Sequence, residues 1–401
     1  MKTVTNVRGF TFWGTHTGIK SKRRDLGLIY SKVPASTACV FTRNIVKAEP
    51  IKLMMERNWP GKSQVVAVNA GNANACTGKQ GREGAEAMVK AAAEAFQISE
   101  DMVVIASTGV IGRTFPTEKV VQGIKDSVKK VTDRRVAASL FANAILTTDT
   151  FPKEEYSEFD LDGVSVRMGG VAKGSGMIHP NMGTMLGFIV SDIAISPELL
   201  DKALKEITEA TFNMITVDGD TSTNDMLAVL CNGMAGNKEI TDANDEGYKL
   251  FYAQLHQICE NLAKLIVSDG EGSTKFIEYK VTGAKTVEEA RKCVRTISNS
   301  ALVKTAMFGR DPNWGRIIAA AGRSGADFDP DKTNLWLKTK KKVALLENGQ
   351  PIEKNLTQVK QMMRSTHIII ILDLQAGEAE ATGWGSDFSY EYVRINAEYT
   401  T

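Results

Sequence analysis

Apolar residues are arranged along the chain in short runs of β-like character, separated by segments with helical spacing. Runs rich in β-branched and aromatic residues are typical of strands. They predict strands at Gln64–Val68, Met102–Ala106, Val164–Met168, Met185–Val190, Leu227–Cys231, Lys275–Val281, Asn334–Leu337, His367–Leu374 and Phe388–Ile395. Strands that alternate with helices indicate a mixed α/β chain, and the pattern leaves the strand order open.

Four segments carry helical signals. The clearest is Lys249–Ile266, whose apolar residues recur at spacings of 4, 3, 4 and 3 and so share one face, namely Phe251, Leu255, Ile258, Leu262 and Leu265. On this helix, His256 and Cys259 are interpreted as core or surface residues rather than ligands. The other predicted helices are the alanine-rich Gly81–Phe96, Pro197–Ile207 capped by Ser196, and Val287–Ile297 opened by Thr286 and Glu289 in capping-box spacing.

The least regular stretch is Gly169–Gly187, GGVAKGSGMIHPNMGTMLG. Its glycines permit backbone angles and close approaches that other residues do not. Three interpretations stay open from the pattern alone: a plain loop, a tight structural crossing, or a segment built for a site.

Composition narrows the class of protein. The 401 residues are 43% hydrophobic and 24% charged, which is typical of a globular protein of one large or two medium units. The formal charge of +2 gives no electrostatic signature of nucleic-acid or membrane binding. The one basic run, Lys338–Lys342, is interpreted as a solvated hairpin or loop.

Five scattered cysteines and four dispersed histidines argue against a disulfide framework and against a metal site. No apolar run approaches the ~20 residues of a membrane span, and the first residues lack the apolar core of a signal peptide. We therefore expect a cytoplasmic protein. Glycine spacing matches neither a P-loop nor a dinucleotide fingerprint, and Asp218–Asp225 lacks the glycine and glutamate of an EF-hand.

Hydroxyl-rich turns remain as candidate chemistry: Ser107–Gly109, Thr147–Asp149 and Gly183–Thr184. A threonine hydroxyl is a weak nucleophile unless a base removes its proton, and an N-terminal threonine can use its own α-amine, with a pKa near ~8. Cleavage of the Gly183–Thr184 bond would create that N-terminus. Most Gly–Thr pairs are simply turns, so this signal is weak by itself.

The segment Lys173–Phe188, KGSGMIHPNMGTMLGF, resembles the cleavage segment of the ornithine acetyltransferase family, the glutamate N-acetyltransferases of arginine biosynthesis. Further blocks resemble the same family in order along nearly the whole chain: Asn69–Gly78, Ala106–Gly112, Leu146–Lys153, Val217–Asp225, Asp269–Phe276, Lys304–Ile317 and Ile395–Thr401.

The resemblance implies an N-terminal-nucleophile enzyme that cuts itself into an α chain, residues 1–183, and a β chain, residues 184–401. Thr184 would carry acetyl from N2-acetylornithine to glutamate by a ping-pong route, with Thr108 and Gly109 as the oxyanion hole. The substrate-binding residues implied are Thr147, Lys173, Thr184, Glu271, Asn396 and Thr401.

The fold implied is α/β, with β-sheets stacked between helical layers, of the ornithine acetyltransferase and aminopeptidase-like type. The family particle is an α2β2 heterotetramer, and its chemistry needs no metal or organic cofactor. The sequence leaves open whether acetyl-CoA is a second donor. No nucleic-acid or membrane partner is expected.

Two positions depart from the family pattern. Gly183 stands where alanine is common before the nucleophile, and His179 stands where a small residue is more usual. We interpret His179 as facing outward, the alternative being an effect on donor choice.

Two other functions are weighed. A peptidase or amidase of the related fold would use the same Thr184 and oxyanion donors, and the amino-acid-binding blocks favour the transferase. An uncleaved scaffold is disfavoured because Thr184 is present rather than alanine or valine.

Overall fold

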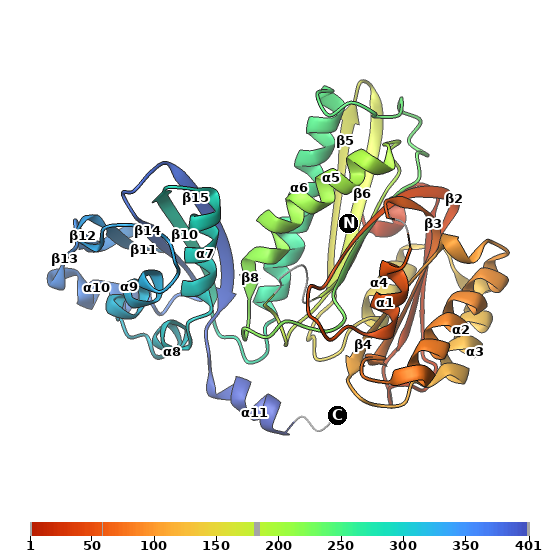
Figure 1. The fold of residues 1–401 in the computed structure, drawn as a ribbon, viewed down its shortest axis with the longest axis horizontal. Coiled ribbons are helices and arrows are strands. Elements are labelled where there is room, and N and C mark those ends of the chain that lie inside the picture. Colours follow the sequence, from red (N-terminus) through yellow and green to blue (C-terminus); the bar gives the residue numbers. More distant parts are fainter. Residues whose placement is uncertain (1, 58, 180–184, 399–401) are drawn as a thin grey trace. The chain divides into compact units, whose positions relative to one another are not determined.

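The computed structural model describes residues 2–57, 59–179 and 185–398 (Figure 1). The described residues form two compact units that interleave along the chain. The first unit takes residues 2–174, 185–212 and 221–266, and the second takes 175–179, 213–220 and 267–398. Each contains a sheet with helices packed on it, so the predicted α/β class is confirmed.

In its described part, the first unit has an eight-stranded sheet in the order β4-β3-β2-β9-β7-β6-β5, with β1 paired to β2. Its strands are β1 (Phe10–Thr15), β2 (Leu26–Phe41), β3 (Gly61–Asn72), β4 (Val103–Val110), β5 (Lys153–Leu161), β6 (Val164–Lys173), β7 (Leu186–Ser191) and β9 (Met226–Cys231). Its helices are α1 (Glu49–Met55), α2 (Gly78–Phe96), α3 (Thr117–Ser127), α4 (Arg135–Ala144), α5 (Pro197–Ala210) and α6 (Glu246–Ser268), whose last two residues belong to the second unit. Helices α2 and α3 lie side by side (Figure 1).

The described part of the second unit has a seven-stranded sheet in the order β13-β12-β11-β14-β10-β15-β8. Its strands are β8 (Ile215–Thr216), β10 (Phe276–Ala284), β11 (Asn334–Lys338), β12 (Lys342–Glu347), β13 (Gln350–Pro351), β14 (His367–Asp373) and β15 (Ala379–Ser386). Its helices are α7 (Val287–Ser298), α8 (Ala301–Gly309), α9 (Trp314–Gly322), α10 (Leu356–Met362) and α11 (Tyr390–Glu398). Short 3-10 turns occupy Val4–Asn6, Glu100–Met102, Val128–Lys130, Phe212–Met214, Pro330–Lys332 and Glu353–Asn355.

Local sequence signals account for much of this architecture. Ser196 and Thr286 accept the backbone N–H of the third helical residue of α5 and α7, as their positions predict. On α6, the predicted stripe is buried except for Leu265, which is partly exposed, and Cys259 also lies in the core. The basic run forms the turn of the β11–β12 hairpin, where Lys338 pairs with Lys342, which confirms the hairpin interpretation.

The glycines of the irregular stretch begin inside a strand. Gly169 to Lys173 complete β6, so the plain-loop interpretation is wrong for these residues. A Cβ atom on Gly170 would lie 2.8 Å from the side chain of Leu262 on α6. Glycine is used here because it lets the helix approach the strand closely.

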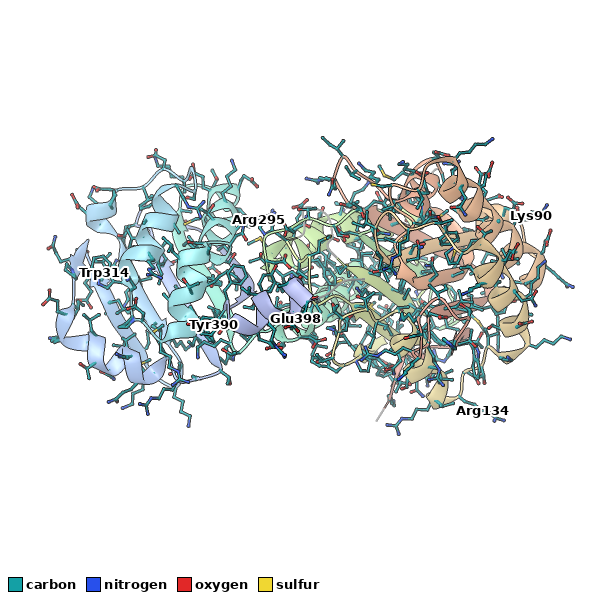
Figure 2. All side chains as sticks on the ribbon, turned by 90° about the horizontal axis from the view of Figure 1, so that it is seen from below. Lys90, Arg134, Arg295, Trp314, Tyr390 and Glu398 are labelled. Atoms are coloured by element: carbon teal, nitrogen blue, oxygen red, sulfur yellow. The ribbon has the colours of Figure 1, made fainter. Side chains whose placement is uncertain are left out.

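The strand predicted at Phe388–Ile395 is wrong, since these residues lead into helix α11. The Ser389 hydroxyl accepts hydrogen bonds from the backbone N–H groups of Glu391 and Tyr392, at 3.1 and 3.4 Å. Phe388 and Tyr392, four residues apart, stack with ring centroids 5.0 Å apart. Because none of the helix residues is buried, capping and local pairs stabilise α11 rather than the core pattern used for the prediction. Tyr390 and Glu398 mark its ends in Figure 2.

In the described parts of the chain, no helix has both the length and the apolar character needed to cross a bilayer.

Candidate functional site

The predicted site residues fall in two units and one undescribed segment. Thr108, Gly109, Thr147 and Lys173 belong to the first unit, and Glu271 and Asn396 to the second. Gly183, Thr184 and Thr401 lie outside the described residues. Each group is therefore considered within its own unit.

The end of β4 presents Thr108 and Gly109. Strands β3 and β4 run parallel, with Thr108 opposite Ala70 and Gly109 opposite Gly71. Gly109 has φ of +132°, and a Cβ atom there would lie 2.4 Å from the carbonyl carbon of Gly71. Only glycine fits this close approach without a backbone shift, so the neighbouring strand β3 fixes the end of β4.

Lys173, the last residue of β6, links the predicted hydroxyl groups. Its ammonium donates to Thr147 Oγ1 at 2.7 Å and to Thr108 Oγ1 at 3.4 Å. An ammonium group has donors only, so both hydroxyl oxygens accept and each hydroxyl hydrogen is left for another acceptor. The structure thus brings Thr108, Thr147 and Lys173 together in one polar centre.

Asp149 holds this centre in place and is 2% exposed. Its carboxylate accepts hydrogen bonds from the Lys153 ammonium at 2.8 Å, the Gly174 N–H at 2.7 Å and the Thr147 N–H at 3.0 Å, and Lys173 Nζ lies 3.7 Å away. Burial raises the pKa of this carboxyl, but the charges of Lys173 and Lys153 outweigh it and hold the pKa well below its usual range. Asp149 is therefore ionised at neutral pH.

Asn224 ties the ends of β3 and β4 to the block at residues 217–225. Its side-chain amide donates to the carbonyl oxygens of Ala73 at 2.6 Å and Ser107 at 2.8 Å. The Ser107 hydroxyl in turn donates to Asn69 Oδ1 at 2.5 Å. Because Ser107 precedes Thr108, this buried network fixes the backbone that carries the predicted oxyanion donors.

In the second unit, Glu271 and Asn396 form a pair. Asn396 Nδ2, on α11, donates to Glu271 Oε2 at 3.0 Å and to the Tyr392 carbonyl at 3.0 Å. Glu271 lies in the turn after α6, where its N–H donates to the Ser175 carbonyl at 3.0 Å. The amide of Asn396 occupies one acceptor site of the Glu271 carboxylate, and the remaining carboxylate lone pairs can accept hydrogen bonds from an ammonium group.

The segment Ser175–His179 precedes the undescribed residues and is held by Asp218. The Asp218 carboxylate accepts the N–H groups of Met177 at 2.6 Å and Ile178 at 2.8 Å. The Ser175 hydroxyl donates to the Asp269 carbonyl at 2.6 Å. Asp218, the first residue of the block at 218–225 that resembles a calcium loop in sequence, therefore accepts backbone N–H groups.

The outward interpretation of His179 is wrong. Arg295 Nη2 lies 3.2 Å from His179 Nε2, and a guanidinium can only donate, so the imidazole nitrogen accepts. Burial lowers the pKa of His179 to about 4, and the charges of Arg295 and Lys304 add to the effect. The sequence could not reveal this because Arg295 is 116 residues away.

We expect His179 to make the protein less stable as the pH falls from 6.5 towards 4. In this window the unfolded chain binds a proton at His179 and the folded chain does not, so the free energy of unfolding decreases by up to about 1.4 kcal/mol per pH unit. Urea unfolding at pH 4.5 to 7 should show a shallower pH dependence for His179→Gln. His367→Gln, at an exposed histidine, is the control and should keep the wild-type slope. Equal slopes for all three proteins would contradict the assignment.

Sequence reasoning missed the roles of several buried charged groups. In the sequence, Asp149 is noted only as part of the turn Thr147–Asp149. Lys153 and Asp218 are noted only as members of segments that resemble the family. Lys304 is fully buried, and burial lowers its pKa to about 7, with Asp218 and Asp387 opposing the shift. Nothing in composition distinguishes these residues from surface charges, and the only usable signal is their position inside blocks shared with the family.

On an α/β scaffold, a buried ammonium group that hydrogen-bonds two threonine hydroxyls can orient donors towards developing negative charge, as enzymes of acyl transfer require. A profile of the ArgJ family matches residues 11–401. The chain belongs to the ArgJ family, which confirms the family indicated by the sequence blocks.

The similarity to individual proteins is close. The chain is 49% identical to the arginine biosynthesis bifunctional protein ArgJ of Caldanaerobacter subterraneus subsp. tengcongensis, covering 98% of this chain and 97% of the relative. It is 45% identical to the protein of the same name from Symbiobacterium thermophilum, covering 99% and 98%. The crystal structure of ArgJ from Bacillus halodurans is 40% identical, with a TM-score of 0.51, and covers 53% of this chain and 98% of that chain.

Proposed function

We propose that this chain is the acetyltransferase of arginine biosynthesis that moves acetyl from N2-acetylornithine to glutamate. The observation that carries the proposal is the contact of the Lys173 ammonium with the hydroxyls of Thr147 and Thr108 in a member of the ArgJ family. The relatives' shared name, arginine biosynthesis bifunctional protein, supports the pathway. In this proposal acetyl-CoA is a second acetyl donor.

The chemistry requires Thr184 as the nucleophile. Its hydroxyl first attacks the Gly183 carbonyl, and hydrolysis of the resulting ester separates an α chain, 1–183, from a β chain, 184–401. The freed α-amine of Thr184 then serves as its base. Thr184 attacks the acetyl carbonyl of the donor, ornithine leaves, and glutamate accepts the acetyl group from the acetyl-threonine ester.

Thr108 and Gly109 are proposed as the oxyanion hole. Since the Thr108 oxygen accepts from Lys173, its hydrogen can donate to the oxyanion, beside the N–H of Gly109. For substrate binding we propose Thr147, Lys173 and Thr184, together with Glu271, Asn396 and Thr401. The ammonium of Lys173 suits a substrate carboxylate, and Glu271 with Asn396 suits an amino group.

The test joins intact mass with an acetyl-exchange assay. The purified protein should give two masses that divide the chain between Gly183 and Thr184 under denaturing conditions, and Thr184→Ala should give one uncut chain of about 43.7 kDa. The cut protein should make acetylglutamate from acetylornithine and glutamate, and the variant should not. An uncut wild type without exchange would refute the proposal. Release of acetate with no transfer to glutamate would indicate a hydrolase instead.

We expect the two chains to stay together after cleavage. Strand β7, in the proposed β chain, pairs with β6 of the α chain from Lys173↔Leu186 to Met168↔Ser191. Strand β9, also in the β chain, pairs with β2. Because both strands are fully buried, separation would expose a large apolar surface. Native size-exclusion chromatography should give one species, and denaturing gels two bands; two native species would contradict this expectation.

The assembly and location are part of the same proposal. We propose an α2β2 heterotetramer in the cytoplasm, which light scattering and cell fractionation can test.

A further inference from the structure

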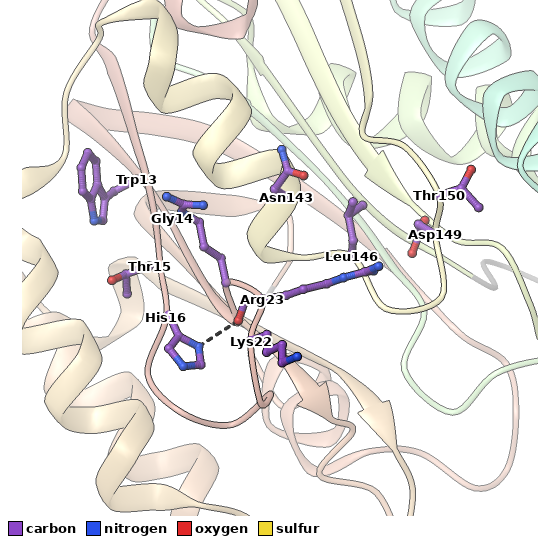
Figure 3. A pocket seen from close by; sticks show the side chains of 11 residues that line it. Trp13, Gly14, Thr15, His16, Lys22, Arg23, Asn143, Leu146, Asp149 and Thr150 are labelled. Carbon is purple, nitrogen blue, oxygen red and sulfur yellow. Dashed lines mark hydrogen bonds between the residues drawn. The ribbon is translucent and has the colours of Figure 1, made fainter. Parts of the chain in front are cut away.

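The first unit contains a cavity of about 720 Å³. Its walls come from β1, the loop that follows β1, and the segment after α4, and include Trp13, Lys22, Arg23, Arg24, Asp149 and Thr150 (Figure 3). The volume lies within the range of about 300–1,000 Å³ that is typical of sites for small molecules.

The loop after β1 is held in shape by a buried carboxylate. Asp25 is fully buried and accepts the N–H groups of Thr17 at 2.6 Å, Ile19 at 2.8 Å and Lys20 at 3.0 Å. His16 Nδ1 lies 2.9 Å from the Arg23 carbonyl oxygen, the contact drawn as a dashed line in Figure 3. These hydrogen bonds fix the conformation of the loop, so the charged residues at its tip have a defined position.

The tip carries three consecutive cations, Lys22, Arg23 and Arg24, all exposed. Across the described residues, none of the three has an ion pair with a carboxylate. The acid in the wall, Asp149, is already bound by Lys153 and lies near Lys173. Burial lowers the pKa of Lys20 to about 8, and the charges of Lys173 and Arg23 add to the effect. The cavity thus attracts an anion, and guanidinium groups bind phosphate in particular.

The cavity adjoins the polar centre. Arg23 Nη1 is 3.5 Å from the Thr147 carbonyl oxygen, and Leu146, Asp149 and Thr150 belong to the wall. Trp13 adds an indole to the same wall, and such rings stack on nucleotide bases. A ligand with phosphates and a base could bind here with its other end at Thr147 and Lys173.

We infer that this cavity binds the phosphate-bearing nucleotide end of an acyl carrier, with coenzyme A as the chemical class. The inference rests on the proposed function, which moves acetyl groups through Thr184. In the transfer step the thioester C–S bond breaks, an ester C–O bond forms at Thr184, and the hydroxyl proton passes through the α-amine to the departing sulfur. The cation cluster then distinguishes this donor from acetylornithine, which has no phosphate.

The experiment compares two charge-matched double variants of the full-length cut protein. Lys22→Gln with Arg24→Gln removes two cations of the cavity, and Lys129→Gln with Lys130→Gln removes two exposed cations elsewhere in the first unit. Coenzyme A binding is measured by calorimetry, and acetyl transfer to glutamate is measured with acetyl-CoA, acetyl-pantetheine and acetylornithine as donors.

We expect the cavity variant to bind coenzyme A about tenfold or more weakly and to lose a similar factor in kcat/KM with acetyl-CoA. Its transfer from acetyl-pantetheine and acetylornithine should match that of the wild type, and the control variant should be unchanged throughout. Binding of coenzyme A that is equal in the two variants, or absent from the wild type, would overturn the inference. Equally tight binding of ATP, lost in the same variant, would overturn the assignment to an acyl carrier.

The two proposals fail in different ways. If the wild type transfers no acetyl from acetylornithine, the proposed function fails, and the coenzyme A titration still decides the role of the cavity. If transfer from acetylornithine is normal and coenzyme A does not bind, only the cavity assignment fails.

Discussion

Thr108→Val is expected to lower kcat for acetyl transfer from acetylornithine to glutamate by about 100- to 1,000-fold, the usual effect of removing one oxyanion donor. Valine keeps the shape of threonine on β4 and removes the hydroxyl that accepts from Lys173. KM should change little, because the lost hydrogen bond belongs to the transition state. Steady-state kinetics on the cut fraction, measured by intact mass, would show the effect.

Two further variants separate chemistry from packing. Thr108→Ser keeps the hydroxyl, so its kcat should stay within about tenfold of the wild-type value. Thr11→Val changes another buried strand threonine of the same unit, whose hydroxyl donates to the Tyr30 carbonyl at 3.4 Å. The Thr11→Val variant should have the wild-type kcat. A Thr108→Val protein with wild-type kcat would remove Thr108 from the proposed oxyanion hole.

Asp149→Asn is expected to destabilise the protein by about 3–5 kcal/mol, since it leaves a buried lysine without its counter-charge. Lys153 and Asp149 have side chains that are both 0% exposed. The folded-state pKa of Asp149 is depressed, so its stabilising contribution is present above the pKa of the unfolded chain and is lost only as the pH falls through the folded value. The destabilisation caused by Asp149→Asn should therefore have its full size at pH 7, where it can be measured as a shift of the urea midpoint.

The double variant Asp149→Asn with Lys153→Met provides the decisive comparison. Removing both partners of a buried ion pair costs less than removing one, so the double variant should be more stable than Asp149→Asn alone. Asp133→Asn, at an exposed aspartate, should be neutral. If Asp133→Asn and Asp149→Asn shift the midpoint equally, the buried pair does not hold the site.

The residues of the proposed site differ in how far the sequence could predict them. The blocks around Thr108, Thr147, Lys173, Glu271 and Asn396 point to their roles by resemblance, and the contacts of Lys173 with Thr108 and Thr147 agree with one site. The roles themselves, and those of Thr184, Gly183 and Thr401, stay predictions. The buried carboxylates that support the site have no signal in the sequence.

Elements with local signals could be predicted from the amino-acid sequence alone. The stripe of α6, the caps at Ser196 and Thr286, and the apolar runs of β3 and β4 depend on neighbours only a few residues away. It also determined the family, because shared blocks extend along almost the whole chain.

Which charged residues from distant parts of the chain meet depends on the folded structure. It paired Asp149 with Lys153 and Lys173, turned His179 towards Arg295, and placed β7 and β9 between β6 and β2 in one sheet. Residues 390–398 form helix α11 because a cap and exposed local pairs stabilise it, whereas the apolar pattern of 388–395 favours a strand. Charge pairing and burial depend on segments that are far apart in the chain, and a linear pattern carries no information about their distance in space.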